Sequence, residues 1–193
     1  MRGNRRWLLG ITVLLWPLLA VATTKDAQEE ITIRWDIIRV VSFPPPTVDA
    51  GGQSSALAED LSKITLTGSG TFVPAESEDV TGGGRWEVRD SNGNLTGSGT
   101  YEVKRLIRFD LAPGRTRAQD KIGNAADSRA GLAFLRIDYS DGSKGILAVS
   151  CHLAGGSPSS PHSIFEGITA SKGFVDFWSR VAGGLTLFHV VPE

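Results

Sequence analysis

Hydrophobic and polar residues alternate along much of the chain with the period of two residues that is typical of β-strands. The alternating runs are rich in β-branched and aromatic residues, and Gly, Pro, Asn, Asp and Ser separate them. The pattern predicts strands at residues 31–43, 62–73, 85–90, 94–111, 131–139, 144–153, 164–178 and 185–191. No convincing amphipathic helix follows residue 22. About eight strands therefore predict an all-β fold, a single antiparallel barrel or a closely related sandwich.

Two short turn signals define which strands are neighbours. Asn92-Gly93 lies between two alternating runs, and both residues tolerate the positive φ that a tight hairpin requires. Ser140, Asp141, Gly142 and Ser143 form a second turn signature. The sequence therefore predicts two β-hairpins. The segment "AGGSPSSPHS", residues 154–163, is predicted to be a flexible connection.

The first 22 residues have the layout of a secretory signal peptide. Arg2, Arg5 and Arg6 precede an apolar run, which ends in Ala20-Val21-Ala22. The alternative, an uncleaved anchor, is disfavoured because the apolar run is short for a bilayer span of about 20 residues. We therefore expect a signal peptide at 1–22, a polar lead-in at 23–30 and one β-barrel domain at 31–193, secreted or placed in the periplasm.

Charge and cysteine content narrow the function classes. The chain after residue 22 has 17 basic and 21 acidic residues, a net charge of −4 with histidine neutral. No basic field favours nucleic acid as a partner. Cys151 is the only cysteine and cannot form an internal disulfide. The sequon Asn94-Leu95-Thr96 is glycosylated only in a host with that machinery.

A glycine-containing heptad occurs twice and is echoed once. "LTGSGTF" at residues 66–72 recurs as "LTGSGTY" at 95–101, and "ITASKGF" at 168–174 is a looser third copy. Glycine inside a strand marks a bend, a bulge or a close approach of backbone. We expect curved sheet corners there rather than glycines that hold the backbone against a ligand. The nucleotide-binding, hydrolase and zinc-helix motifs that we considered do not occur, so no cofactor is predicted.

Cys151 and His152 look like a reactive pair but are predicted to point to opposite faces. Strand alternation places Cys151 in an apolar row with Leu147, Val149 and Leu153, which is the environment of a core thiol. A zinc site built from His152, His162, His189 and a carboxylate has no supporting ligand spacing. No metal site and no catalytic residue are therefore predicted, and His162 is interpreted as a surface-loop residue.

Three residues are candidates for the lining of an internal cavity: Arg105, His152 and Trp86. Arg105 interrupts the apolar row Tyr101, Val103, Ile107, Phe109 and Leu111, and a buried guanidinium needs an acid, a carbonyl or an anionic ligand. We favour structural pairing with an acid such as Asp36 or Glu166. The aromatic residues Trp35, Trp86, Phe174, Phe177 and Trp178 are expected to fill the core rather than wall a pocket.

Four segments carry a family resemblance: "SKITLTGSGTF", "VTGGGRWEV", "AGLAFLRIDYSDGSKGILAVSCHL" and "SIFEGITASKGFVDFW". They resemble a family of uncharacterised, secreted, mostly bacterial proteins of this size, which brings no established activity. The strand order and the late strand "FEGITASKGFVDF" are similar to the eight-stranded barrel of the allene oxide cyclase and dirigent type. That resemblance implies a barrel that holds an apolar substrate. None of its catalytic motifs matches this sequence position by position, so no active residue is carried over.

Three functions follow as hypotheses. The first is a secreted β-barrel module, structural or binding a small apolar molecule, as a monomer or small oligomer. The second is a cofactor-free cyclase or isomerase in which Arg105 or His152 polarises an apolar substrate. The third is a surface adhesion or assembly module that uses the stretch from Phe174 to Trp178. The sequence favours a non-enzymatic role.

Overall fold

The computed structural model describes residues 31–42, 44–153 and 165–192. The predicted signal peptide at 1–22, the lead-in at 23–30 and the whole of the predicted connection at 154–163, with His162, lie outside the described residues. The elements are β1 (Thr32–Ser42), β2 (Thr47–Asp49), β3 (Ser54–Leu57), β4 (Lys63–Leu66), β5 (Ser69–Val73), β6 (Glu76–Val80), β7 (Gly83–Arg89), β8 (Leu95–Ala112), β9 (Gln119–Asp120), a 3-10 helix η1 (Ala125–Asp127), β10 (Ser128–Tyr139), β11 (Lys144–Cys151), β12 (Gly167–Lys172), β13 (Val175–Phe177), β14 (Ser179–Arg180) and β15 (Leu185–Val191).

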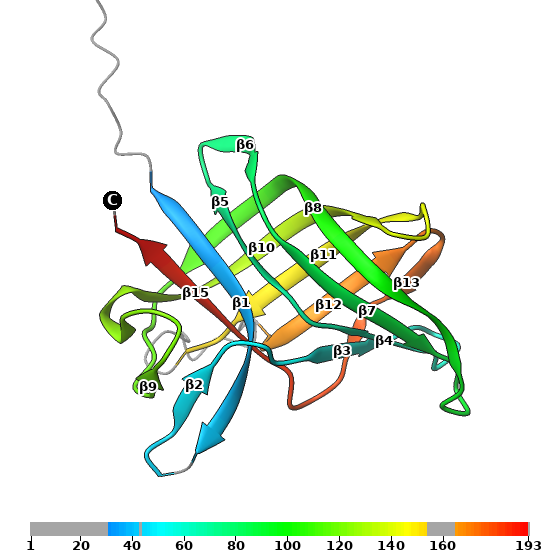
Figure 1. Ribbon diagram of the computed structural model, residues 1–193, viewed down its shortest axis with the longest axis horizontal. Coiled ribbons are helices and arrows are strands. Elements are labelled where there is room, and N and C mark those ends of the chain that lie inside the picture. Colours follow the sequence, from blue (N-terminus) through cyan, green and yellow to red (C-terminus); the bar gives the residue numbers. More distant parts are fainter. Residues whose placement is uncertain (1–30, 43, 154–164, 193) are drawn as a thin grey trace, which may run out of the picture.

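Six of these strands close into an antiparallel barrel, in the order β1, β5, β7, β8, β10, β15 and back to β1. The other nine strands of the described chain are peripheral and pair with the barrel strands or with one another. In Figure 1 the long strands β7, β8, β10 and β11 run side by side, and the sheet continues through β12 to β13. The all-β barrel prediction is confirmed, with the ring closed by six strands rather than about eight.

Both predicted hairpins are present. Between β7 and β8, the Gly93 N–H donates to the carbonyl of Asp90, and Gly93 has a φ of +86°. Between β10 and β11, the Gly142 N–H donates to the carbonyl of Tyr139, and Gly142 has a φ of +85°. Glycine tolerates positive φ better than other residues, so its presence at both positions makes the turns recognisable in the sequence.

Two predicted strands are interrupted in the structure. The run at 62–73 splits into β4 and β5 at Gly68, where a Cβ would lie 2.6 Å from the carbonyl oxygen of Gly83. The run at 164–178 splits at Gly173, which has a φ of +60° and turns β12 back onto β13. Single long strands were therefore wrong at both places. The two glycines act differently: at Gly68 the chain continues in the same direction along β7, whereas at Gly173 it reverses.

Aromatic side chains fill the barrel interior. Phe72, Phe109 and Phe188 form three edge-on contacts with ring centroids 5.0 to 6.3 Å apart. Trp35 is completely buried beside them in the core. Burial of each such side chain stabilises the fold by roughly 1.5–3 kcal/mol. The prediction of core filling is correct for Trp35, Trp86 and Phe177, whereas Phe174 and Trp178 are exposed.

Candidate functional site

Arg105, predicted to line a cavity, lies on the exposed surface. Relative to β10, β8 contains one extra residue, Lys104, between Val103 and Arg105. Because a β-bulge reverses the alternation that follows it, Leu106 rather than Arg105 turns inward. A second extra residue, Ile107, restores the original alternation further along the strand. Simple alternation therefore placed Arg105 and Ile107 on the wrong face.

The partner of Arg105 also differs from the expectation. Its Nε lies 3.2 Å from Oε1 of Glu78, and both side chains are more than half exposed. Structural pairing with an acid was the right type of interaction, but the acid is neither Asp36 nor Glu166. An exposed pair of this kind contributes at most about 1 kcal/mol. Arg105 is thus a surface residue.

Cys151 and His152 point to opposite faces, as strand alternation predicted. Cys151 is fully buried in the core, whereas His152 is exposed at the end of β11. Burial raises the pKa of the Cys151 thiol, and the nearby Glu166 carboxyl adds to this effect. A protonated, buried thiol is a poor nucleophile. Neither Arg105 nor His152 lies inside the barrel, so neither can polarise an enclosed substrate as the cyclase hypothesis requires.

Of the three candidates, Trp86 lines a pocket in the part of the chain that the structure describes. This pocket has a volume of about 210 Å³ and opens at the surface near the β7–β8 hairpin. Its lining consists of Trp86, Val88, Thr96, Gly97, Asp141, Lys172, Val175 and Phe177. The sequence pattern points to Trp86 and Phe177 as aromatic residues of interest but gives no sign that Lys172 and Asp141 join them. Only the folded sheet brings β12 next to Trp86.

The repeated glycines make room for the Trp86 indole. Trp86 lies opposite Gly99 in the register of β7 and β8, and Val88 lies opposite Gly97. A Cβ at Gly97 would lie 3.1 Å from two ring atoms of Trp86. The indole Nε1–H donates to the carbonyl of Thr100 at 3.1 Å. The ring is therefore held flat against the glycine strand, which is a close-approach role for "LTGSGTY".

Lys172 supplies the charge in this pocket. Its Nζ lies 4.3 Å from the centroid of the Trp86 ring and 5.1 Å from that of Tyr139. The same ammonium forms an ion pair with Asp141. Hydrogen bonds from Lys172 and Ser143 lower the pKa of Asp141 to about 2. The pocket thus combines an apolar wall with a cation that is fixed by two aromatic rings and a carboxylate.

A second polar cluster lies at the opposite end of β11. One carboxylate oxygen of Glu166 accepts the backbone N–H of His152 at 2.5 Å, and the other accepts that of Thr186 at 2.6 Å. Burial raises the pKa of Glu166 to about 7, although these hydrogen bonds and the charge of Arg180 oppose the rise. Glu166 therefore bridges β11 and β15 as a carboxyl group that titrates near neutrality.

His189 forms a buried pair with a carboxylate rather than a metal site. Its Nε2 lies 2.6 Å from Oδ2 of Asp120, and both side chains are at most 4% exposed. Burial raises the pKa of Asp120, but hydrogen bonds from His189 and from the backbone N–H groups of Ile122 and Gly123 outweigh burial and lower it. Among the described residues, no group of three or more His, Cys, Asp or Glu side chains is arranged to hold a metal ion.

No known protein family is identified for this chain. Comparison of the chain with family models, with curated proteins and with solved structures finds no match. The barrel is therefore the part of the resemblance that the structure supports.

Within the described ranges, no helix is long and apolar enough to cross a membrane.

Proposed function

We propose that this chain is an exported β-barrel protein that binds a small, mainly apolar molecule in the Trp86 pocket. The observation that carries the proposal is the composition of the pocket wall, in which Trp86, Val88, Val175 and Phe177 lie beside the Lys172 ammonium. Binding pockets are typically apolar with a few fixed polar groups, and this pocket has that composition. Export is supported by the pattern of residues 1–22.

The pocket volume limits the ligand. About 210 Å³ is below the roughly 300–1,000 Å³ that is usual for drug-sized ligands. We therefore propose a compact molecule or a single-ring portion of a larger one. Its apolar part contacts Val88 and Val175, and the Lys172–Asp141 pair suits a polar substituent.

Displacement of a hydrophobic dye tests this proposal. Val175 lines the pocket and is 43% exposed, so Val175→Glu places a charge in the pocket without disturbing the core. Val40, on β1, has the same 43% exposure and lies away from the pocket, so Val40→Glu is the matched control. We expect Val175→Glu to weaken dye binding by at least about tenfold and Val40→Glu to leave it unchanged.

Native mass spectrometry of the secreted chain complements the dye assay. Retention of a small molecule by the natural protein, and its loss in Val175→Glu, would support the proposal. A chain with no saturable dye binding and no retained molecule would refute it. The measured mass of the secreted chain also shows whether cleavage follows Ala22.

A second candidate function, assembly with another copy of the chain, is favoured by the exposed side chains at β13. Phe174 is fully exposed, and Trp178 is 56% exposed. Within the described chain β13 pairs only with β12, so its other edge is free. An antiparallel copy of β13 can hydrogen bond to this edge in a symmetric dimer and bury both aromatic residues.

Analytical ultracentrifugation distinguishes this candidate from ligand binding alone. We expect the natural chain to dimerise with rising concentration and the double variant Phe174→Ser/Trp178→Ser to stay monomeric. Leu61→Ser removes a 63% exposed side chain elsewhere on the surface and is the control. A natural chain that stays monomeric at every concentration would exclude assembly through β13.

A further inference from the structure

A larger pocket lies where β8 ends and β10 begins. It has a volume of about 510 Å³ and is lined by Leu111, Ala112, Pro113, Gly114, Arg115, Thr116, Arg117 and Arg129. Three of these eight residues are arginines and none is acidic. The pocket is thus a concentration of positive charge on a chain whose net charge is negative.

The three arginines have no carboxylate partner in the part of the chain that the structure describes. Arg115, Arg117 and Arg129 take part in none of its ion pairs. By contrast, Arg105 and Arg108 on the preceding strand β8 each pair with a carboxylate. Gathering unpaired guanidinium groups costs electrostatic energy, and an anion in the pocket removes that cost.

Hydrogen bonds hold the two segments that carry these arginines together. The backbone N–H of Thr116 donates to Oγ of Ser128 at 2.9 Å, and that hydroxyl donates to the carbonyl of Ala125 at 2.7 Å. Ser128 is fully buried, so this connection is shielded from water. Because Arg115 precedes Thr116 and Arg129 follows Ser128, the connection places both arginines at one pocket.

The Arg129 guanidinium is itself preorganised. Its Nη1 donates to the backbone carbonyls of Ala126, at 3.0 Å, and of Ser128, at 2.8 Å. These bonds fix the plane of the guanidinium and leave its other N–H groups available to a ligand. A fixed arginine loses less conformational entropy on binding than a freely moving one.

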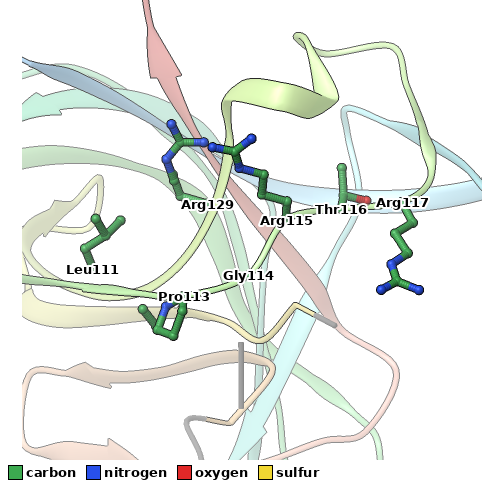
Figure 2. A pocket seen from close by; sticks show the side chains of 8 residues that line it. Leu111, Pro113, Gly114, Arg115, Thr116, Arg117 and Arg129 are labelled. Carbon is green, nitrogen blue, oxygen red and sulfur yellow. The ribbon is translucent and has the colours of Figure 1, made fainter. Parts of the chain in front are cut away.

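Figure 2 shows how the side chains are directed. The guanidinium groups of Arg115 and Arg129 extend in the same direction, whereas Arg117 turns the other way. Leu111 and Pro113 form the apolar side of the same pocket. The site therefore combines two guanidinium groups that extend in the same direction with an apolar surface beside them. The guanidinium of Arg117 lies apart from this pair.

We propose that this pocket binds a small molecule through a phosphate group held between Arg115 and Arg129. A phosphate group offers several acceptor oxygens to two guanidinium groups, which form strong, charge-assisted and often bidentate hydrogen bonds. The volume exceeds that of phosphate alone, so the rest of the molecule contacts Leu111 and Pro113. A soluble phosphate ester and a phospholipid headgroup share this chemistry.

Calorimetry and vesicle flotation test the site and separate the two sources. The natural chain is titrated with glycerol 3-phosphate and, separately, mixed with vesicles of phosphatidylglycerol or of phosphatidylcholine. Arg115→Gln is the main variant because the Arg115 side chain is exposed, and Arg129→Gln is the second. Arg136→Gln is the matched control: Arg136 is exposed on the same strand as Arg129 and does not line the pocket.

We expect each pocket variant to weaken binding by about tenfold and Arg136→Gln by less than about twofold. Binding of glycerol 3-phosphate with this pattern supports a soluble ligand. Flotation with phosphatidylglycerol alone, with the same pattern, supports a lipid headgroup. Absence of both, or equal losses in Arg115→Gln and Arg136→Gln, would overturn the proposal. The Val175→Glu variant is expected to keep this binding, so failure of the Trp86 site and failure of this site are distinguishable.

Discussion

Replacing Glu166 by glutamine tests how a partly buried carboxyl group couples the stability of this barrel to pH. Glu166 accepts backbone N–H groups from His152 and Thr186 and so ties β11 to β15. Burial nevertheless raises its pKa from 4.5 to about 7. The folded protein therefore binds a proton more tightly at Glu166 than the unfolded chain does.

The sign of the effect follows from this difference. The stabilisation due to the raised pKa is fully present below about pH 4.5 and is lost as pH rises toward 7. A rise of about 2.5 pKa units corresponds to roughly 3 kcal/mol of unfolding free energy. Glu166→Gln removes the titration and also replaces one acceptor oxygen with a donor, which costs about 1 kcal/mol at every pH.

The measurement is the unfolding free energy from urea denaturation at about pH 4, 5, 6, 7 and 8. We expect the natural chain to be more stable than Glu166→Gln by about 1 kcal/mol at pH 4 and less stable by about 2 kcal/mol at pH 8. The exposed Glu59→Gln is the control and is expected to track the natural chain throughout.

A difference between the natural chain and Glu166→Gln that stays constant with pH would refute the reasoning. A natural chain that gains stability over the variant as pH rises would refute it more strongly. That outcome would mean that the two backbone N–H bonds outweigh burial and that Glu166 is already ionised when the protein folds. Carbon-13 NMR titration of the Glu166 carboxyl gives an independent reading of its pKa.

Three further predictions address single interactions. Asp120→Ala leaves His189 buried without its partner and is expected to cost about 3 kcal/mol or more in urea unfolding; a loss below about 1 kcal/mol would show that the pair contributes little. Phe72→Ala removes a core ring that contacts two other aromatic residues and is expected to cost about 3–5 kcal/mol, measured by thermal unfolding; an unchanged melting temperature would contradict the assigned core. Gly68→Ala forces a Cβ to within 2.6 Å of the Gly83 carbonyl oxygen and is expected to lower the melting temperature by several degrees. Gly93→Ala, at the exposed hairpin, is expected to cost about 1 kcal/mol. Equal effects of the two substitutions would show that the close approach of β7 to Gly68 does not restrict the residue there.

The sequence by itself determined the strands that carry clear alternation and the turns that carry positive φ. β10 and β11 lie where the pattern predicts them, and Cys151 is a core thiol opposite an exposed His152. Asn92-Gly93 forms the expected hairpin turn. These features depend on interactions between residues close in sequence, so local chemistry is enough to predict them.

Tertiary structure decided which face Arg105 occupies and how the ring closes. The extra residue Lys104 is visible only against the register of β10, and it turns Arg105 outward. Likewise, the folded sheet brings Lys172, at the end of β12, to the ring of Trp86 on β7, and the Thr116–Ser128 hydrogen bond brings the segments of Arg115 and Arg129 together. Register, ring closure and charge clusters are relations between distant segments, and the pattern within any one segment does not contain them.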